Sequence, residues 1–173
     1  HGGWAREQGK TTHNHIYFGD SISTHFQREV ERRFFNHHLK GRDEPALPEA
    51  YMFDTGTKEW KRFEKWPPEE VQPTSLYFGA NGTLSLGTPL DEEAAFDYIS
   101  DPAKPVPYTS QTEGLTFTPR RFMSDDQRHA SRRPDVLTFT TGPLEENKTI
   151  AGEILAKLKV SMTGTDADFI VKL

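Results

Sequence analysis

The fold class of this chain is decided by residues 74–86, which read TSLYFGANGTLSL. Asn81 and Gly82 at its centre both tolerate the positive φ angles that tight hairpin turns require. The segments on either side, 74–78 and 83–86, are rich in aromatic and β-branched residues and favour strands. The stretch therefore predicts two antiparallel strands joined at Asn81-Gly82.

Further strand signals follow the same pattern along the chain from residue 45 onward. Tyr51 and Phe53 lead into the turn-forming residues 54–57, and 58–63 then completes a second predicted hairpin. Residues 136–141 are aromatic and β-branched. Residues 150–160 place apolar side chains on one face and charged ones on the other with a period of two, which predicts a half-buried strand.

Two more segments complete the predicted architecture. Residues 168–173 alternate as the start of another strand, whereas the three prolines within 101–108 exclude a central strand and indicate an extended crossing. About eight short strands without alternating helices indicate a mainly β protein, a β-sandwich or jelly roll. We assign this domain to residues 45–173.

The first 44 residues have a different character. Thr24 and Gln27 form a capping box, and Phe26, Val30 and Phe34 recur on one face, with Phe35 and Leu39 widening the stripe. Gly41 follows a basic last turn and is typical of a helix end. We therefore predict one amphipathic helix over 24–40, whose apolar stripe needs another layer to pack against.

Composition excludes several classes of function. The formal net charge of -5 argues against a nucleic-acid partner, which requires a basic face. The chain has no cysteine, hence no disulfide or cysteine nucleophile, and no apolar run long enough to span a bilayer. It begins without Met and ends in an alternating apolar run, so we expect both ends to lie within a longer protein.

Seven histidines raise the question of a metal site. His13 and His15 would share one side of an extended segment, whereas His37 and His38 are neighbours on a helix and point about 100° apart. No cluster of carboxylates at ligand spacing completes either pair. We therefore predict no metal site at these histidines.

One candidate nucleophile lies at Ser21. The segment Gly19-Asp20-Ser21 resembles the nucleophile block of SGNH (GDSL-type) esterases, and Asp126 with His129 resembles their Asp-x-x-His block. That resemblance implies attack by Ser21, proton transfer to His129, orientation of the imidazole by Asp126, and oxyanion stabilisation by Asn81. The predicted strands and turns of 45–173 do not suit the three-layer α/β fold of such enzymes, so we keep this as an alternative.

A series of longer motifs resembles a single hydrolase superfamily. In chain order these are His1-Gly2-Gly3-Trp4-Ala5-Arg6, Phe18-Gly19-Asp20, FFNHHLKG at 34–41, YISDPAKPVP at 98–107, Asp125-Asp126-Gln127-Arg128, RPDVL at 133–137 and GTDADF at 164–169. Their order is similar to that in the superfamily of α-amino acid ester hydrolases, glutaryl-7-aminocephalosporanic acid acylases and Xaa-Pro dipeptidyl-peptidases. The resemblance covers nearly the whole chain.

This resemblance implies a serine hydrolase acting on esters or amides of small acyl groups. His1 would be the triad histidine, acting as general base and then general acid. Residues 1–44 would end an α/β-hydrolase domain with its last helix, and 45–173 would form a jelly-roll-like β-sandwich. The nucleophile would precede residue 1, in agreement with the Ser, Asp, His order of α/β-hydrolases. The rest of the hydrolase chain would then be the partner of these residues.

A non-catalytic β-sandwich binding module remains the other alternative. Trp60, Trp66 and Tyr77 would then form a ligand surface, although packing inside the protein is the commoner role of sandwich aromatics. The charged residues of 125–135 would either line a substrate mouth or form an ion-paired loop, and we favour the loop. Unpaired strand edges favour a homo-oligomer. The acyl group of the substrate and the cellular location are not encoded in these residues.

Overall fold

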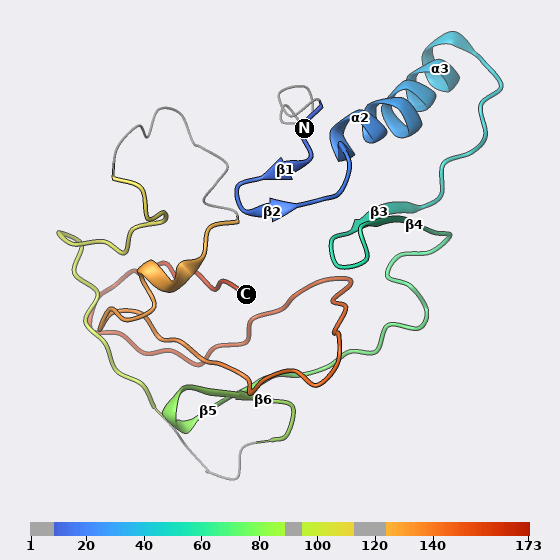
Figure 1. Cartoon of the computed structure of the whole chain (residues 1–173). Helices are drawn as coiled ribbons and strands as arrows, with labels where there is room; N and C mark the ends of the chain where they lie inside the picture. Colours follow the sequence, from blue (N-terminus) through green and yellow to red (C-terminus); the bar gives the residue numbers. More distant parts are fainter. Residues whose placement is uncertain (1–8, 89–94, 113–123) are drawn as a thin grey trace.

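The computed structural model describes residues 9–88, 95–112 and 124–173. Within them the structure is mostly non-helical, with three separate two-stranded antiparallel sheets, one long helical segment and two short 3₁₀ turns. Figure 1 shows the helix projecting away from the hairpins, with β1 and β2 near its beginning and β5 and β6 far from it. The predicted mainly β character is confirmed, and the described strands are paired only within hairpins.

The hairpin predicted around residues 51–63 is present. β3 (Ala50–Asp54) pairs with β4 (Glu59–Phe63) in antiparallel register, so that Phe53 lies opposite Trp60. Asp54 closes the turn because its Oδ1 accepts hydrogen bonds from the amides of Gly56 (2.8 Å) and Thr57 (3.1 Å). Its other oxygen accepts from Nζ of Lys61 at 2.6 Å.

The hairpin predicted at Asn81-Gly82 is also present, with shorter strands than expected. β5 (Tyr77–Gly79) pairs with β6 (Thr83–Ser85), and the three-residue turn places Asn81 at φ 60° and Gly82 at φ 71°. A third segment joins this hairpin through a parallel bridge between Thr83 and Thr140. That bridge is the only regular pairing of the predicted strand 136–141 among the described residues.

A third hairpin lies near the beginning of the described chain and was not predicted. β1 (Thr12–His13) pairs with β2 (Ile16–Tyr17), and Asn14 in the turn adopts φ 53°. The amide of Phe18 donates to the carbonyl of Thr11 at 2.9 Å and closes the base of the hairpin. Only two residues pair on each side, too few for an alternating apolar pattern to reveal them.

The helix predicted over 24–40 begins two residues earlier. It consists of α2 (Ile22–Phe26), a π-helical turn (Gln27–Glu31) and α3 (Arg32–Lys40), and Gly41 ends it in the left-handed conformation at φ 59°. The C-terminal signal is confirmed, but the capping box at Thr24 is wrong. Ser21 occupies the N-cap position instead, and Thr24 lies inside the first turn, where its hydroxyl bonds to Ser21.

The two faces of α3 are opposite to the usual arrangement. Arg33 and Asn36 are buried against the segment that follows the helix. Nη2 of Arg33 donates to the carbonyl of Pro45 at 2.9 Å, and Nδ2 of Asn36 donates to Oε1 of Glu44 at 2.9 Å. The part of the predicted apolar stripe that lies on α3 faces outward instead, with Leu39 exposed to 75%, whereas Phe26 and Val30 before it are half-buried. Phe34 and Phe35 are also exposed. Among the described residues, no second layer therefore covers the α3 part of the stripe.

The strands predicted over 150–160 and 168–173 are not formed. Residues 150–160 run without regular pairing, and both Ile150 and Ile154 are 64% exposed. The alternating pattern reports only which face is apolar, whereas a strand also needs a neighbouring ladder of backbone partners. Residues 101–108 form no strand, as their prolines predicted.

Little apolar surface is buried within this chain. Its accessible surface is 14663 Å², whereas a compact monomer of 19.7 kDa exposes about 8,600 Å². Ala130 is the only buried hydrophobic residue among those that the structure describes. The helices of the described residues are too short and too polar to span a bilayer.

Candidate functional site

Ser21, the nucleophile of the SGNH-type alternative, lies in a cluster of hydroxyl groups at the start of α2. Its Oγ is 2.9 Å from Oγ1 of Thr24 and 3.4 Å from Oγ of Ser23. The same Oγ accepts a hydrogen bond from the amide of Gly9 at 3.1 Å, and Thr24 shares that amide at 3.3 Å. Ser21 therefore tethers the segment that enters β1.

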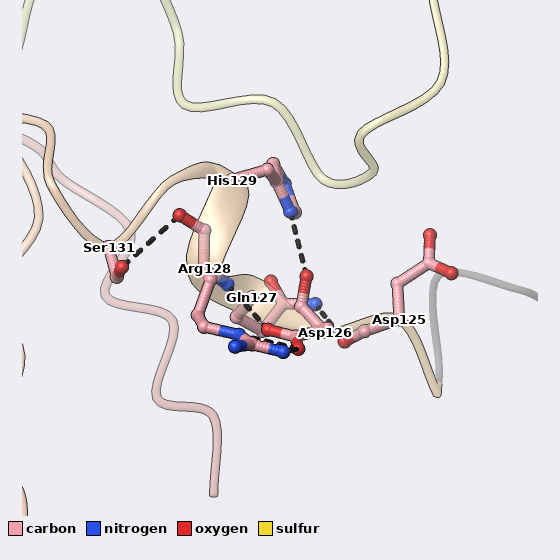
Figure 2. A network of polar contacts seen from close by, with 6 residues as sticks. All are labelled: Asp125, Asp126, Gln127, Arg128, His129 and Ser131. Atoms are coloured by element: carbon pink, nitrogen blue, oxygen red, sulfur yellow. Dashed lines mark hydrogen bonds and ion pairs between the residues drawn. The ribbon is translucent and has the colours of Figure 1, made fainter. Parts of the chain in front are cut away.

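Asp126 and His129 lie on one short 3₁₀ turn, Gln127–His129 (Figure 2). The Asp126 carboxylate accepts hydrogen bonds from the guanidinium and the backbone amide of Arg128, and these bonds lower the pKa of Asp126 from 3.8 to about 2. Nδ1 of His129 donates to the backbone carbonyl of Asp126 at 3.0 Å, and Nε2 lies 3.4 Å from the Pro107 carbonyl oxygen.

These contacts do not assemble the alternative triad. The imidazole of His129 faces carbonyl oxygens rather than a serine hydroxyl, and the Asp126 carboxylate is engaged by Arg128 rather than by the imidazole. A Ser-His-Asp triad requires the opposite arrangement in both respects. Asn81, its expected oxyanion donor, lies in the β5–β6 turn. His1, the histidine of the main hypothesis, lies outside the described residues.

Asp125 has contacts of a different kind from those of Asp126. Its Oδ1 accepts a hydrogen bond from Nδ2 of Asn14 at 2.7 Å, across 111 residues of sequence. Its Oδ2 accepts from Oγ1 of Thr109 at 2.7 Å, and Thr109 is 4% exposed. One carboxylate therefore connects the β1–β2 turn to the end of the proline-rich crossing. No local signal in the sequence distinguishes Asp125 from Asp126.

The charged residues between 125 and 135 form local ion pairs. The guanidinium of Arg133 contacts both oxygens of Asp135 at 2.8 and 2.6 Å, and it lowers the pKa of that carboxyl. Nη2 of Arg133 also donates to the carbonyl of Lys104 at 2.9 Å. This pairing agrees with the predicted ion-paired loop, which it anchors to the proline-rich crossing.

The geometry of the described residues supports neither a metal site nor a ligand surface built from Trp60, Trp66 and Tyr77. Across 9–88, 95–112 and 124–173, no group of three or more histidines and carboxylates is placed to hold a metal ion. Trp60 packs against three neighbouring rings and Trp66 packs edge-on against Phe63. These two tryptophans are thus half-buried packing residues, whereas Tyr77 remains 37% exposed.

Comparison with protein families assigns most of the chain. Residues 44–173 match the model of the X-Pro dipeptidyl-peptidase C-terminal non-catalytic domain. The chain is 32% identical over 154 residues to cocaine esterase of Rhodococcus sp. (strain MB1 Bresler), covering 83% of this chain and 26% of that protein. It is 25% identical over 143 residues to a putative serine esterase of Mycobacterium bovis, covering 82% and 22%.

Two solved structures are similar to this one. An aminopeptidase from a marine sediment archaeon, Thaumarchaeota archaeon, superposes with a TM-score of 0.68 at 34% identity, covering 83% of this chain and 24% of the other. An α-amino acid ester hydrolase labelled with selenomethionine gives a TM-score of 0.64 at 32% identity, covering 80% and 24%. The chain therefore spans about a quarter of the length of these relatives.

Proposed function

Because this chain belongs to the family of the X-Pro dipeptidyl-peptidase C-terminal non-catalytic domain, we propose that it is part of a serine hydrolase that cleaves or transfers small acyl groups. Esters and amides are the substrate class, as in α-amino acid ester hydrolases and acylases. The main support for this proposal is the similarity at 32–34% identity to a named esterase, an ester hydrolase and an aminopeptidase. All three matches cover at least 80% of the chain.

The position of the family match suggests a different role for each part of the chain in this proposal. Residues 44–173 supply a structural domain of jelly-roll type, and His1, which precedes it, supplies the general base. The imidazole takes the proton of a serine in another part of the polypeptide and returns it to the leaving group. Such acyl transfer requires neither a metal nor a cofactor. Asp126 and His129 lie inside the domain that the family describes as non-catalytic, which opposes the SGNH-type alternative.

The exposed surface supports a place within a larger polypeptide. The accessible area exceeds that of a compact monomer of this mass by about 6,000 Å², since 14663 Å² is exposed. The outward face of α3 is apolar, with Phe34, Phe35 and Leu39 all exposed, and the alternating segment 150–160 exposes its isoleucines. Burial of such surface is the main driving force of folding. We propose that the remainder of the hydrolase covers both regions, so that the helix packs on the catalytic domain.

Hydrolysis of a small nitrophenyl ester tests this proposal. The 173-residue chain alone and its Ser21→Ala variant are compared with the longer polypeptide that contains these residues and with the His1→Ala variant of that polypeptide. We expect activity only in the longer polypeptide and its loss in His1→Ala. Activity of the 173-residue chain that disappears in Ser21→Ala would instead establish Ser21 as the nucleophile. Full activity of the His1→Ala variant would exclude His1 as the base.

A further inference from the structure

We propose that Asp125 is a positioning residue through which the C-terminal domain holds the segment that follows the catalytic histidine. This inference rests on the proposed function, in which His1 is the general base. The hydrogen bond from Asn14 to Asp125 is the contact that carries it, because it joins the β1–β2 turn to the domain that begins at residue 44.

Asp125 is itself held in place on the side of the C-terminal domain. Its Oδ2 accepts a hydrogen bond from the hydroxyl of Thr109, a residue only 4% exposed. Its backbone carbonyl accepts from Nε2 of Gln127 at 2.8 Å, and Oε1 of Gln127 accepts in turn from Nζ of Lys172 at 2.6 Å. With its backbone and one oxygen fixed, the carboxylate presents Oδ1 to Asn14 at 2.7 Å.

The segment on the other side is also constrained at both ends. Asn14 sits at φ 53° in the tight turn of a hairpin whose base is closed by the bond from Phe18 to Thr11. The amide of Gly9, where the chain enters this hairpin, is held by the hydroxyls of Ser21 and Thr24. The β1–β2 hairpin, which follows residues 1–8 in the sequence, is therefore bonded to Asp125 at its turn and to the hydroxyls of Ser21 and Thr24 near its base.

The consequence for catalysis is geometric. A general base acts only within hydrogen-bond reach of the proton it takes, so a small displacement of its loop slows the chemical step. A displacement of about 1 Å can lower the rate about 100-fold. Loss of the Asn14–Asp125 bond should therefore lower kcat, while KM, which depends on the acyl pocket, stays close to its original value.

An exchange of the two side chains tests the proposal in the full-length hydrolase. Asn14→Asp places two carboxylates face to face, and we expect kcat for a nitrophenyl ester to fall about 10- to 100-fold with KM changed less than about twofold. In the double variant Asn14→Asp/Asp125→Asn, the side-chain amide nitrogen at position 125 donates to the carboxylate at position 14. The amide oxygen at position 125 still accepts a hydrogen bond from the hydroxyl of Thr109. We expect this exchange to restore kcat to within about threefold of the original, a rescue that requires direct contact of the pair.

Two further variants complete the test. Glu146→Gln is the matched control, because its exposed carboxylate pairs with the neighbouring Lys148 and makes no contact with the β1–β2 turn among the interactions of the described residues, and kcat should not change. If Asn14→Asp does not yield folded protein, Asn14→Gly replaces it, since glycine adopts φ 53° and lacks the donor. Its kcat should fall in the same way.

The outcomes separate this proposal from the function on which it rests. An unchanged kcat in Asn14→Asp or Asn14→Gly, or a double variant no better than the single one, would overturn the role of Asp125. If that result accompanies loss of activity in His1→Ala, the proposed function stands without the positioning contact. If His1→Ala retains full activity, His1 is not the base and the positioning role of Asp125 is overturned with it, whereas a full-length protein without esterase activity would overturn the proposed function itself.

Discussion

The imidazole of His25 stacks on the indole of Trp60, with ring centroids 4.6 Å apart and ring planes 16° apart. Nε2 of the same imidazole lies 2.9 Å from the hydroxyl of Tyr51. His25 belongs to α2, whereas Tyr51 and Trp60 belong to β3 and β4. These rings therefore join the N-terminal helix to the first hairpin of the C-terminal domain, on opposite sides of residue 44, where the family match begins.

We expect the full-length protein to lose stability when this cluster is reduced. Trp60→Ala removes a half-buried ring with three aromatic neighbours and should lower the free energy of unfolding by about 2–3 kcal/mol. Tyr51→Phe removes only the bond to His25 and should cost about 0.5–1.5 kcal/mol. Urea unfolding measures both, with Tyr17→Phe as an exposed control. Equal effects of Tyr17→Phe and Tyr51→Phe would contradict the role of the hydrogen bond.

Substitution of Gly82 in the β5–β6 turn should destabilise the protein, whereas substitution of Asn81 by glycine should have little effect on stability. A Cβ at Gly82 would lie 2.8 Å from the carbonyl oxygen of Thr138, and φ of 71° is unfavourable for alanine. Gly82→Ala should therefore lower the free energy of unfolding by about 1–3 kcal/mol. Asn81→Gly accepts φ of 60° and should change it by less than about 1 kcal/mol. Thermal unfolding compares the two, and a neutral Gly82→Ala would argue against this turn geometry.

The β3–β4 hairpin should lose a stabilising contribution at low pH. The hydrogen bond from Lys61, aided by the Thr57 and Gly56 amides, lowers the pKa of Asp54 from 3.8 to about 2. Because the folded state binds its proton more weakly than the unfolded state, the contribution is complete above pH 4 and is lost as the pH falls toward 2. Carbon-13 NMR titration of the Asp54 carboxyl measures this value directly. In Lys61→Met the pKa should rise, and an unchanged pKa would refute the assigned cause.

Ser21→Ala should distinguish a tether from a nucleophile. In the full-length hydrolase we expect this variant to keep at least about a tenth of the original kcat, because Thr24 still holds the amide of Gly9. Removal of a triad nucleophile lowers kcat by about 10⁶-fold. The same assay of His1→Ala should show a loss of about 10⁴- to 10⁶-fold. The opposite ranking of the two variants would support Ser21 as the nucleophile.

A charge on the apolar face of α3 should reduce dye binding by the 173-residue chain and should destabilise the full-length protein. Leu39 is 75% exposed within this chain, so Leu39→Glu should reduce binding of a hydrophobic dye by the 173-residue chain. In the full-length hydrolase the same change buries a charge at the proposed packing surface and should lower the melting temperature by several degrees. Lys40→Glu, one residue away, is the control. An unchanged melting temperature would place this face in solvent in the full-length protein.

The elements that could be predicted from the sequence are those with local causes. The Asn81-Gly82 turn, the Asp54 turn and the helix end at Gly41 each depend on side chains and φ angles within a few residues. The proline-rich crossing is equally local, since proline removes backbone donors wherever it stands. The order of several moderate motifs indicated the family, which the match over residues 44–173 confirmed.

Contacts between groups far apart in the sequence could be found only from the folded structure. Asp125 and Asp126 are identical in sequence chemistry, yet one contacts Asn14 across 111 residues and the other pairs with Arg128 two residues away. The helix likewise buries Arg33 because the chain returns with Glu44 and Pro45 beside it, and the apolar residues of α3, Phe34, Phe35 and Leu39, remain exposed. Periodicity states which side chains share a face, but the neighbour of that face is set by chain closure over long separations. For the same reason the alternating residues 150–160 remain unpaired here, since a strand exists only where a second backbone supplies its hydrogen bonds.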